Sequence, residues 1–416
     1  MEAFEVTGGR PLHGTTRIYG AKNAALPILA ATVMAGDVCV IQGVPRLQDV
    51  RVMVRILQSL GATVEWMDDT ITVDPRQIQS TDVPDDLMRQ MRSSIFLMGP
   101  LLARFGEVRV SRPGGCVIGQ RPIDYHLRGM KDLGAKVEEA HGYVRCTANR
   151  LYGNHISLDF PSVGATENLM MAAVFADGVT VLENVAREPE IVDLARFLEK
   201  CGASIEGAGD DSIRIRGVHH LTGTTHQVIP DRIVAGTMMI AAAATGGDVT
   251  LEGVIPSHLG ATMTKLKETG VQVTVERDII RVNQGASRLA ADIRTAPFPG
   301  FPTDLQAPAM ALLTTVSGTS VIRESVFEAR FKHVNELVRM GADIAVDIQT
   351  AVIRGVPRLS GALVEASDLR GGAALVIAGL MAEGKTRIEG LQHIDRGYQQ
   401  LETMLRDLGA DITRID

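Results

Sequence analysis

The thiol of Cys116 lies in a segment whose composition suits a reactive site. Residues 112–122 run Arg-Pro-Gly-Gly-Cys-Val-Ile-Gly-Gln-Arg-Pro, so three glycines and two prolines surround the cysteine. Such a stretch predicts a mobile lid with an exposed sulfur, whereas most cysteines are buried. The nearby Arg121 favours the thiolate and would lower the pKa of the thiol. We therefore interpret Cys116 as reactive, and the other three cysteines as structural: Cys39, Cys146 and Cys201.

Polar and charged residues gather at two kinds of position: the starts of apolar helices, and the loops after the strands that follow them. Helix N-termini offer free N–H groups, and arginines bind phosphate or carboxylate with paired hydrogen bonds, so the pattern predicts anion binding. Taken singly, each position is equally compatible with an ordinary cap or a solvated side chain. The positions at helix starts are Lys22, Asn23, Arg92, Ser162, Val163, Gly164, Asp231, Arg232, Thr303, Asp304, Asp368, Leu369 and Arg370, and those in loops are Arg46, Asp49, 116–124, Arg187, Glu188, Arg330, Lys332, Asp395 and Arg396.

These positions recur because the chain contains a repeat of about 70 residues. One glycine, followed by Ala or Val, recurs six times at intervals of 68 to 73 residues. A second glycine, which ends an apolar run, recurs six times at intervals of 66 to 72 residues. Two markers with one period indicate six copies of a unit. The first set is Gly61, Gly134, Gly202, Gly270, Gly341 and Gly409; the second is Gly36, Gly106, Gly178, Gly247, Gly318 and Gly384.

Each copy predicts an α/β unit. In the first copy, an apolar helix over 23–34 precedes a strand over 38–42, and an amphipathic helix over 49–60 precedes a strand over 62–66. The glycine after the amphipathic helix supplies a left-handed cap. The first helices are apolar nearly all round (24–34, 169–176, 238–244 and 373–381), so they belong inside a core. Three copies per domain would enclose three central helices in a shell of sheets and outer helices.

Length and composition limit the function classes. A chain of 416 residues with 45% hydrophobic and 22% charged residues favours two globular domains. The net charge of −7 argues against nucleic acid or an anionic membrane as a general partner. The N-terminus lacks the features of a signal peptide, and the uncharged stretch 305–322 predicts a buried helix followed by a strand. The dispersed cysteines indicate a reducing cytoplasm, without a disulfide framework or a zinc site.

Four motifs closely resemble the UDP-N-acetylglucosamine enolpyruvyl transferase family, over essentially the whole chain. They are Gly-Ala-Lys-Asn-Ala-Ala-Leu-Pro at 20–27, Pro-Gly-Gly-Cys at 113–116, Phe-Pro-Thr-Asp at 301–304 and His-Ile-Asp-Arg-Gly-Tyr at 393–398. The resemblance implies two inverse α/β-barrel domains, each of three βαβαββ-like units around buried helices. One domain would span 22–229 and contain the Cys116 lid. The other would combine 1–21 with 230–416, and the active site would lie in the cleft between them.

The resemblance also implies a reaction and a set of residues. Members transfer the enolpyruvyl group of phosphoenolpyruvate to the 3'-hydroxyl of UDP-N-acetylglucosamine and release phosphate, without metal or cofactor, as the first committed step of peptidoglycan synthesis. Cys116 resembles the general acid, Asp304 the residue at the sugar hydroxyl, and Lys22, Arg121 and Arg396 those that bind phosphoenolpyruvate. Further positions that match substrate-binding residues are Asn23, Arg92, Pro122, Ile123, Asp124, Tyr125, Ser162, Val163, Gly164, Val326 and Arg370.

Two departures and three alternatives accompany this interpretation. Gln48 stands where some members have Lys, and Phe96 where some have Trp. The sister enzyme that acts on shikimate 3-phosphate shares the fold, but it lacks the Pro-Gly-Gly-Cys lid. A non-enzymatic repeat scaffold would expose continuous faces and not discrete cations in phase. A nicotinamide enzyme would need a GxGxxG motif after the first strand of a unit, with an acidic residue at the expected distance, and none of the six units has this combination.

Overall fold

The computed structural model describes residues 2–112, 123–285 and 288–416, which form two compact units. One unit contains the described residues of 20–229, and the other contains residues 2–19 with the described residues of 230–416. We refer to them as the 20–229 unit and the 230–416 unit. The chain leaves one unit between Tyr19 and Gly20 and returns to it between Ile229 and Pro230. The domain limits predicted from the resemblance, 22–229 and 1–21 with 230–416, stay a proposal.

The 20–229 unit contains three sheets among its described residues, one for each copy of the repeat. Each copy has a strand that follows the buried helix, and this strand pairs with a hairpin in antiparallel fashion. In order, the sheets are β13 (Thr225–Gln227), β3 (Cys39–Gln42), β5 (Thr70–Asp74) and β4 (Thr63–Met67); β6 (Glu107–Ser111), β8 (Tyr143–Thr147) and β7 (Lys136–Ala140); and β11 (Ser204–Glu206), β12 (Ser212–Arg216), β10 (Val179–Glu183) and β9 (His155–Ser157).

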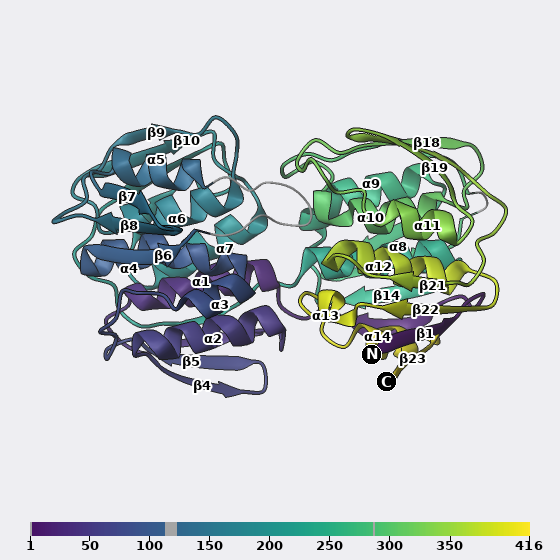
Figure 1. The fold of residues 1–416 in the computed structure, drawn as a ribbon, viewed down its shortest axis with the longest axis horizontal. Coiled ribbons are helices and arrows are strands. Elements are labelled where there is room, and N and C mark those ends of the chain that lie inside the picture. The colour runs from purple at the N-terminus through teal and green to yellow at the C-terminus, as the bar shows by residue number, and fades with distance from the viewer. Residues whose placement is uncertain (1, 113–122, 286–287) are drawn as a thin grey trace. The chain divides into compact units, whose positions relative to one another are not determined.

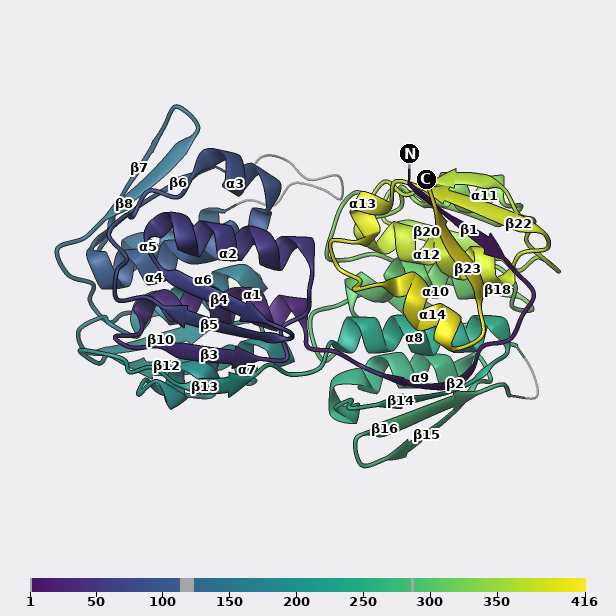
Figure 2. The ribbon, with the colours of Figure 1, turned by 90° about the horizontal axis from the view of Figure 1, so that it is seen from below.

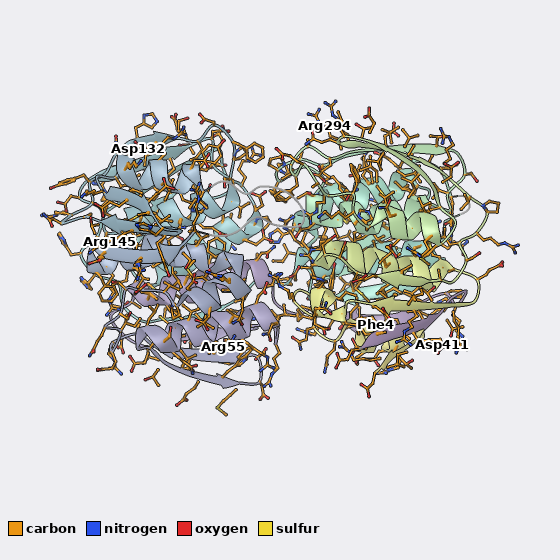
Figure 3. The ribbon with its side chains drawn as sticks, in the orientation of Figure 1. Phe4, Arg55, Asp132, Arg145, Arg294 and Asp411 are labelled. Atoms are coloured by element: carbon orange, nitrogen blue, oxygen red, sulfur yellow. The ribbon has the colours of Figure 1, made fainter. Side chains whose placement is uncertain are left out.

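The 230–416 unit repeats this arrangement, with three four-stranded sheets among its described residues. They are β15 (Gln272–Glu276), β16 (Ile279–Asn283), β14 (Asp248–Glu252) and β2 (His13–Arg17); β17 (Ile293–Arg294), β18 (Thr319–Arg323), β20 (Thr350–Arg354) and β19 (Asp343–Asp347); and β21 (Leu363–Glu365), β22 (Lys385–Glu389), β1 (Ala3–Thr7) and β23 (Asp411–Ile415). The N-terminal strand β1 lies between β22 and β23, so it completes the last copy. Phe4 of β1 and Asp411 of β23 are labelled in Figure 3.

Apolar helices lie inside each unit, as the sequence predicts. In the 230–416 unit, α8, α10 and α12 pack against one another, with the sheets around them (Figures 1 and 2). Nearly every residue of these helices is buried, which explains why they lack a polar face. The buried helices are α1 (Lys22–Ala31), α4 (Met98–Phe105), α6 (Val163–Ala173), α8 (Arg232–Thr245), α10 (Gln306–Leu313) and α12 (Leu369–Met381).

Amphipathic helices form the outer layer, one in each copy. The glycines after them all have φ between 87° and 110°, which confirms the predicted left-handed caps. The outer helices are α2 (Gln48–Leu60), α5 (Asp124–Asp132), α7 (Pro189–Lys200), α9 (Gly260–Glu268), α11 (Val334–Arg339) and α14 (Leu401–Asp407). Shorter helices are α3 (Asp85–Gln90), α13 (Leu391–Ile394), η1 (Thr32–Met34), η2 (Arg92–Leu97), η3 (Pro256–Leu259) and η4 (Thr303–Leu305).

The structure confirms the predicted six copies in two sets of three, and it adjusts several boundaries. The helix predicted over 23–34 is an α-helix up to Ala31 and a 3₁₀ turn thereafter. α6 begins at Val163, ahead of the apolar run 169–176, because Ser162 caps it. The uncharged stretch 305–322 forms α10 and most of β18, as predicted. Within the described ranges, none of the helices is long and apolar enough to span a membrane.

Candidate active site

Three buried helices of the 230–416 unit begin with acidic residues that the sequence predicted at equivalent points. Asp231 caps α8 by accepting hydrogen bonds from the N–H groups of Ile233 and Val234. Asp368 caps α12 in the same way through the N–H groups of Arg370 and Gly371. Asp304, in η4 directly before α10, makes no such cap and uses its carboxylate differently.

The carboxylate of Asp304 lies between two guanidinium groups. Arg330 Nη2 donates to Oδ1 at 2.7 Å, and Arg370 donates to Oδ2 from Nη2 at 2.9 Å and from Nε at 3.2 Å. Both arginines are buried, with 4% of each residue exposed. Burial opposes ionisation of Asp304, but the charges of Arg370 and Arg330 outweigh it and hold the pKa of the carboxyl well below its usual range. Asp304 is therefore a fixed anion and a weak base.

The two arginines retain donors that the described residues do not use. Arg370 Nη1 and Arg330 Nε are buried and have no hydrogen-bond partner among the described residues. Buried guanidinium donors are costly unless they are satisfied, so both arginines retain hydrogen-bonding capacity beyond Asp304. The aromatic rings of Tyr398 and Phe327 lie 5.3 and 5.1 Å from the Arg370 and Arg330 guanidinium carbons. These contacts orient both cations.

In the 20–229 unit, Lys22 opens α1 and is nearly buried. Its Nζ lies 3.1 Å from Asp49 Oδ2, and 8% of Lys22 and 3% of Asp49 are exposed. Asp49 lies in the first turn of α2, so the pair joins the starts of two helices of one copy. Asn23, the next residue of α1, is exposed. The side chain of Lys22 is thereby held at the N-terminus of a buried helix, which is the position the repeat predicted for anion binding.

The residues predicted to line a nucleotide-sugar site lie at two further helix starts. Ser162 accepts a hydrogen bond from the Ala165 N–H at 3.4 Å, and Val163 and Gly164 open α6. Ile123 precedes α5, and Asp124 and Tyr125 begin it. A Cβ atom on Gly164 would lie 3.4 Å from His126 Cε1, so α5 and α6 bring these residues together.

Some of the remaining predicted residues lie within the described chain and others do not. Cys116, Arg121 and Pro122 lie outside the described residues. Arg92 begins η2, Val326 lies in the loop after β18, and Arg396 follows α13 and is half-buried. Cys39, Cys146 and Cys201 are free and buried, as the sequence predicted.

Three residues near these positions had no role assigned from the resemblance: Arg330, Asp49 and His126. The sequence placed Arg330 and Asp49 in loops at the expected phase of the repeat, whereas the structure places Asp49 in the first turn of α2. The sequence could not show the partners of either residue. The sequence did not indicate a role for His126, because a single histidine on a helix is usually a core residue. Its Nδ1 accepts a hydrogen bond from Asn168 Nδ2 at 2.9 Å.

Burial of His126 predicts a loss of stability in acid. Burial lowers the pKa of the imidazole from 6.5 to about 4, opposed only in part by Asp124. Between pH 6.5 and pH 4, His126 is protonated in the unfolded chain but largely neutral in the folded chain. The free energy of unfolding should therefore fall by about 3 kcal/mol as pH drops from 6.5 to 4. Urea unfolding followed across this range should show a smaller slope with pH for His126→Gln than for the wild type.

The matched control is His220→Gln, which changes an exposed histidine of the same unit. Its slope should equal that of the wild type. Equal slopes for His126→Gln and the wild type would contradict the prediction.

Comparison with known proteins agrees with this arrangement. The model of the EPSP synthase (3-phosphoshikimate 1-carboxyvinyltransferase) family matches residues 6–405. A protein of Caldanaerobacter subterraneus subsp. tengcongensis named UDP-N-acetylglucosamine 1-carboxyvinyltransferase 1 is 53% identical over 99% of both chains.

Solved structures agree with the fold. The enolpyruvyl transferase NikO from Streptomyces tendae superposes with a TM-score of 0.90 at 27% identity, over 99% of this chain and 98% of that one. EPSP synthase from Acinetobacter baumannii superposes with a TM-score of 0.76 at 20% identity over 100% of both chains, which shows the common fold. The chain is therefore a transferase that belongs to the family of UDP-N-acetylglucosamine 1-carboxyvinyltransferases, within the wider EPSP synthase family.

Proposed function

We propose that this chain transfers the enolpyruvyl group of phosphoenolpyruvate to the 3'-hydroxyl of UDP-N-acetylglucosamine and releases phosphate. The observation that supports it most is the 53% identity, over nearly the full length of both chains, to a relative named for that reaction. The reaction would be the first committed step of peptidoglycan synthesis, with consequences for cell shape and division and with sensitivity to fosfomycin. The free state of Cys39, Cys146 and Cys201 supports a reducing cytoplasm as the location.

The donor is a small trianion, so the proposal assigns several cations to it. Lys22, Arg121 and Arg396 would bind its phosphate and carboxylate, and the unused Nη1 of Arg370 adds a buried donor. Because Lys22 and Arg396 belong to different units, the proposed reaction requires residues of both. Asn23, Arg92, Arg121 to Tyr125, Ser162 to Gly164 and Val326 would bind the nucleotide sugar.

The proposed chemistry is addition followed by elimination. Cys116 protonates the methylene carbon of the donor while the sugar hydroxyl attacks the adjacent carbon, which forms a tetrahedral ketal. Loss of a proton from the new methyl group and cleavage of the carbon–oxygen bond to phosphate then regenerate the double bond and release phosphate. The same thiol can instead add to the donor and form a covalent thioketal.

Asp304 would orient the attacking hydroxyl. Two guanidinium groups hold its carboxylate ionised, so it is always able to accept a hydrogen bond but takes up a proton weakly. It therefore receives the hydroxyl proton only as the new carbon–oxygen bond forms and the acidity of that proton rises.

A phosphate-release assay with two acceptors tests this function against the alternative. We expect phosphate release from phosphoenolpyruvate with UDP-N-acetylglucosamine and none above background with shikimate 3-phosphate. The control omits any acceptor. Release with shikimate 3-phosphate alone would establish the sister activity, and release with neither acceptor would favour a scaffold role.

A further inference from the structure

We propose that Glu324 is a positioning residue of the acceptor site, which fixes the carboxylate of Asp304 through Thr303 and Arg330. The inference rests on the proposed function, because that function places the acceptor hydroxyl at Asp304. Glu324 directly follows β18, and only 1% of it is exposed. A buried carboxylate is costly unless its oxygens accept hydrogen bonds, so its partners indicate its role.

One oxygen of Glu324 organises the loop that contains Val326. Oε1 accepts hydrogen bonds from the backbone N–H groups of Val326 at 2.8 Å and Phe327 at 3.1 Å. The hydroxyl of Thr295 donates to the same oxygen at 2.9 Å. Val326 is a proposed nucleotide-sugar contact, so this oxygen holds a loop of the acceptor site in place.

The other oxygen begins a series of contacts that ends at Asp304. The Thr303 hydroxyl donates to Glu324 Oε2 at 2.9 Å, which leaves the lone pairs of Thr303 Oγ1 for another donor. Arg330 Nη1 donates to that oxygen at 3.1 Å, and Nη2 of the same group donates to Asp304 Oδ1 at 2.7 Å. Because a guanidinium is planar and rigid, a change at Thr303 Oγ1 moves the whole group, including Arg330 Nη2, which donates to Asp304.

The other copies of the repeat have a different residue type at this point. Four of them have a left-handed residue directly after the corresponding strand, with φ between 52° and 80°. Glu324 is not among the left-handed residues of the described chain. A folding requirement common to the repeat would place a carboxylate in each copy, and only the copy that contains Asp304 has one at this point. The corresponding residues are Gly43, Asn184, Gly253 and Gly390, with Arg112 in the remaining copy.

The roles of the two Glu324 oxygens can be tested separately by measuring steady-state phosphate release in conservative variants. Glu324→Gln retains an oxygen for the three donors at Oε1 and replaces Oε2 with an amide donor that faces Thr303. We expect kcat to fall about tenfold while the KM values for both substrates stay near wild type. Glu324→Ala removes both acceptors, so it should also raise the KM for UDP-N-acetylglucosamine and leave that for phosphoenolpyruvate unchanged.

A double-mutant cycle tests the link to Thr303. Thr303→Val should lower kcat as Glu324→Gln does, and the double variant should lose no more than the worse single variant, because both break one series of contacts. Thr303→Ser retains the hydroxyl and should retain activity. If Glu324→Gln does not fold, the comparison of Thr303→Val with Thr303→Ser decides the question.

Asp292→Asn is the matched control, since Asp292 accepts a hydrogen bond from the Val321 N–H of β18 without contacting Thr303 or Glu324. Its kinetic constants should equal those of the wild type. Wild-type kcat in both Glu324→Gln and Thr303→Val, or losses that multiply in the double variant, would overturn the role of Glu324. The role of Glu324 would also be overturned if the loss of activity only reflected a smaller fraction of folded protein in the variants. Failure of the proposed function is separate, because it would appear in the wild type as no release with UDP-N-acetylglucosamine.

Discussion

Replacing Cys116 with alanine should lower kcat for phosphate release about 1,000-fold, because the donor would lose the acid that protonates its methylene carbon. Cys116→Asp should retain part of the activity, since a carboxylic acid can supply the same proton. Stopped assays with saturating phosphoenolpyruvate and UDP-N-acetylglucosamine measure both variants. A fully active Cys116→Ala enzyme would refute the catalytic role.

Chemical labelling offers an independent measurement on the unmodified protein. Iodoacetamide should abolish turnover by alkylating Cys116, at a rate that UDP-N-acetylglucosamine changes, and fosfomycin should label the same residue. Three buried thiols serve as internal controls, and burial raises the pKa of Cys146 to about 12. Mass spectrometry that found the label on Cys39, Cys146 or Cys201 would contradict the assignment.

Asp304→Asn should reduce both activity and stability. The amide cannot take the hydroxyl proton, so kcat should fall about 1,000-fold in the same assay. Arg330 and Arg370 would remain buried without their counter-charge, which should lower the free energy of unfolding by about 3 kcal/mol in urea titrations.

Asp343→Asn provides the comparison for stability. Asp343 pairs with Arg354 at 3.2 Å on an exposed hairpin of the same unit, and each side chain is more than half exposed. Its loss should change the free energy of unfolding by about 0.5 kcal/mol or less. An Asp304→Asn protein as stable as Asp343→Asn would show that the two arginines do not depend on Asp304.

The repeat was predictable because backbone geometry restricts which residue types can occupy certain positions. Gly61 and its five equivalents adopt a left-handed backbone that other residues rarely adopt, so they remain visible at a fixed period. The buried helices were visible for a similar reason, because a helix enclosed on all sides has no use for a polar face. α8 and α12 lie where the apolar runs predicted them.

Side-chain pairing was less predictable, because it depends on how helices and loops pack. The sequence placed Asp304, Arg330 and Arg370 at corresponding points of the repeat, but it could not show that one carboxylate lies between two guanidinium groups. Glu324 follows a strand directly, where its type resembles an ordinary surface residue, and only its buried contacts reveal a role. Assignments at Cys116, Arg121 and Pro122 stay predictions, since these residues lie outside the described chain.

The position of β1 between β22 and β23 affects how the chain folds during translation. Ala3 is paired with Glu389 on one side and with Ile415 on the other. Residues 3–7 precede both neighbouring strands in the chain, so they leave the ribosome long before residues 385–389 and 411–415 have been made. β1 can therefore join its sheet only after residues 20–384 have been translated. Until β23 has been made, one edge of β1 lacks its partner and is open to association with other chains.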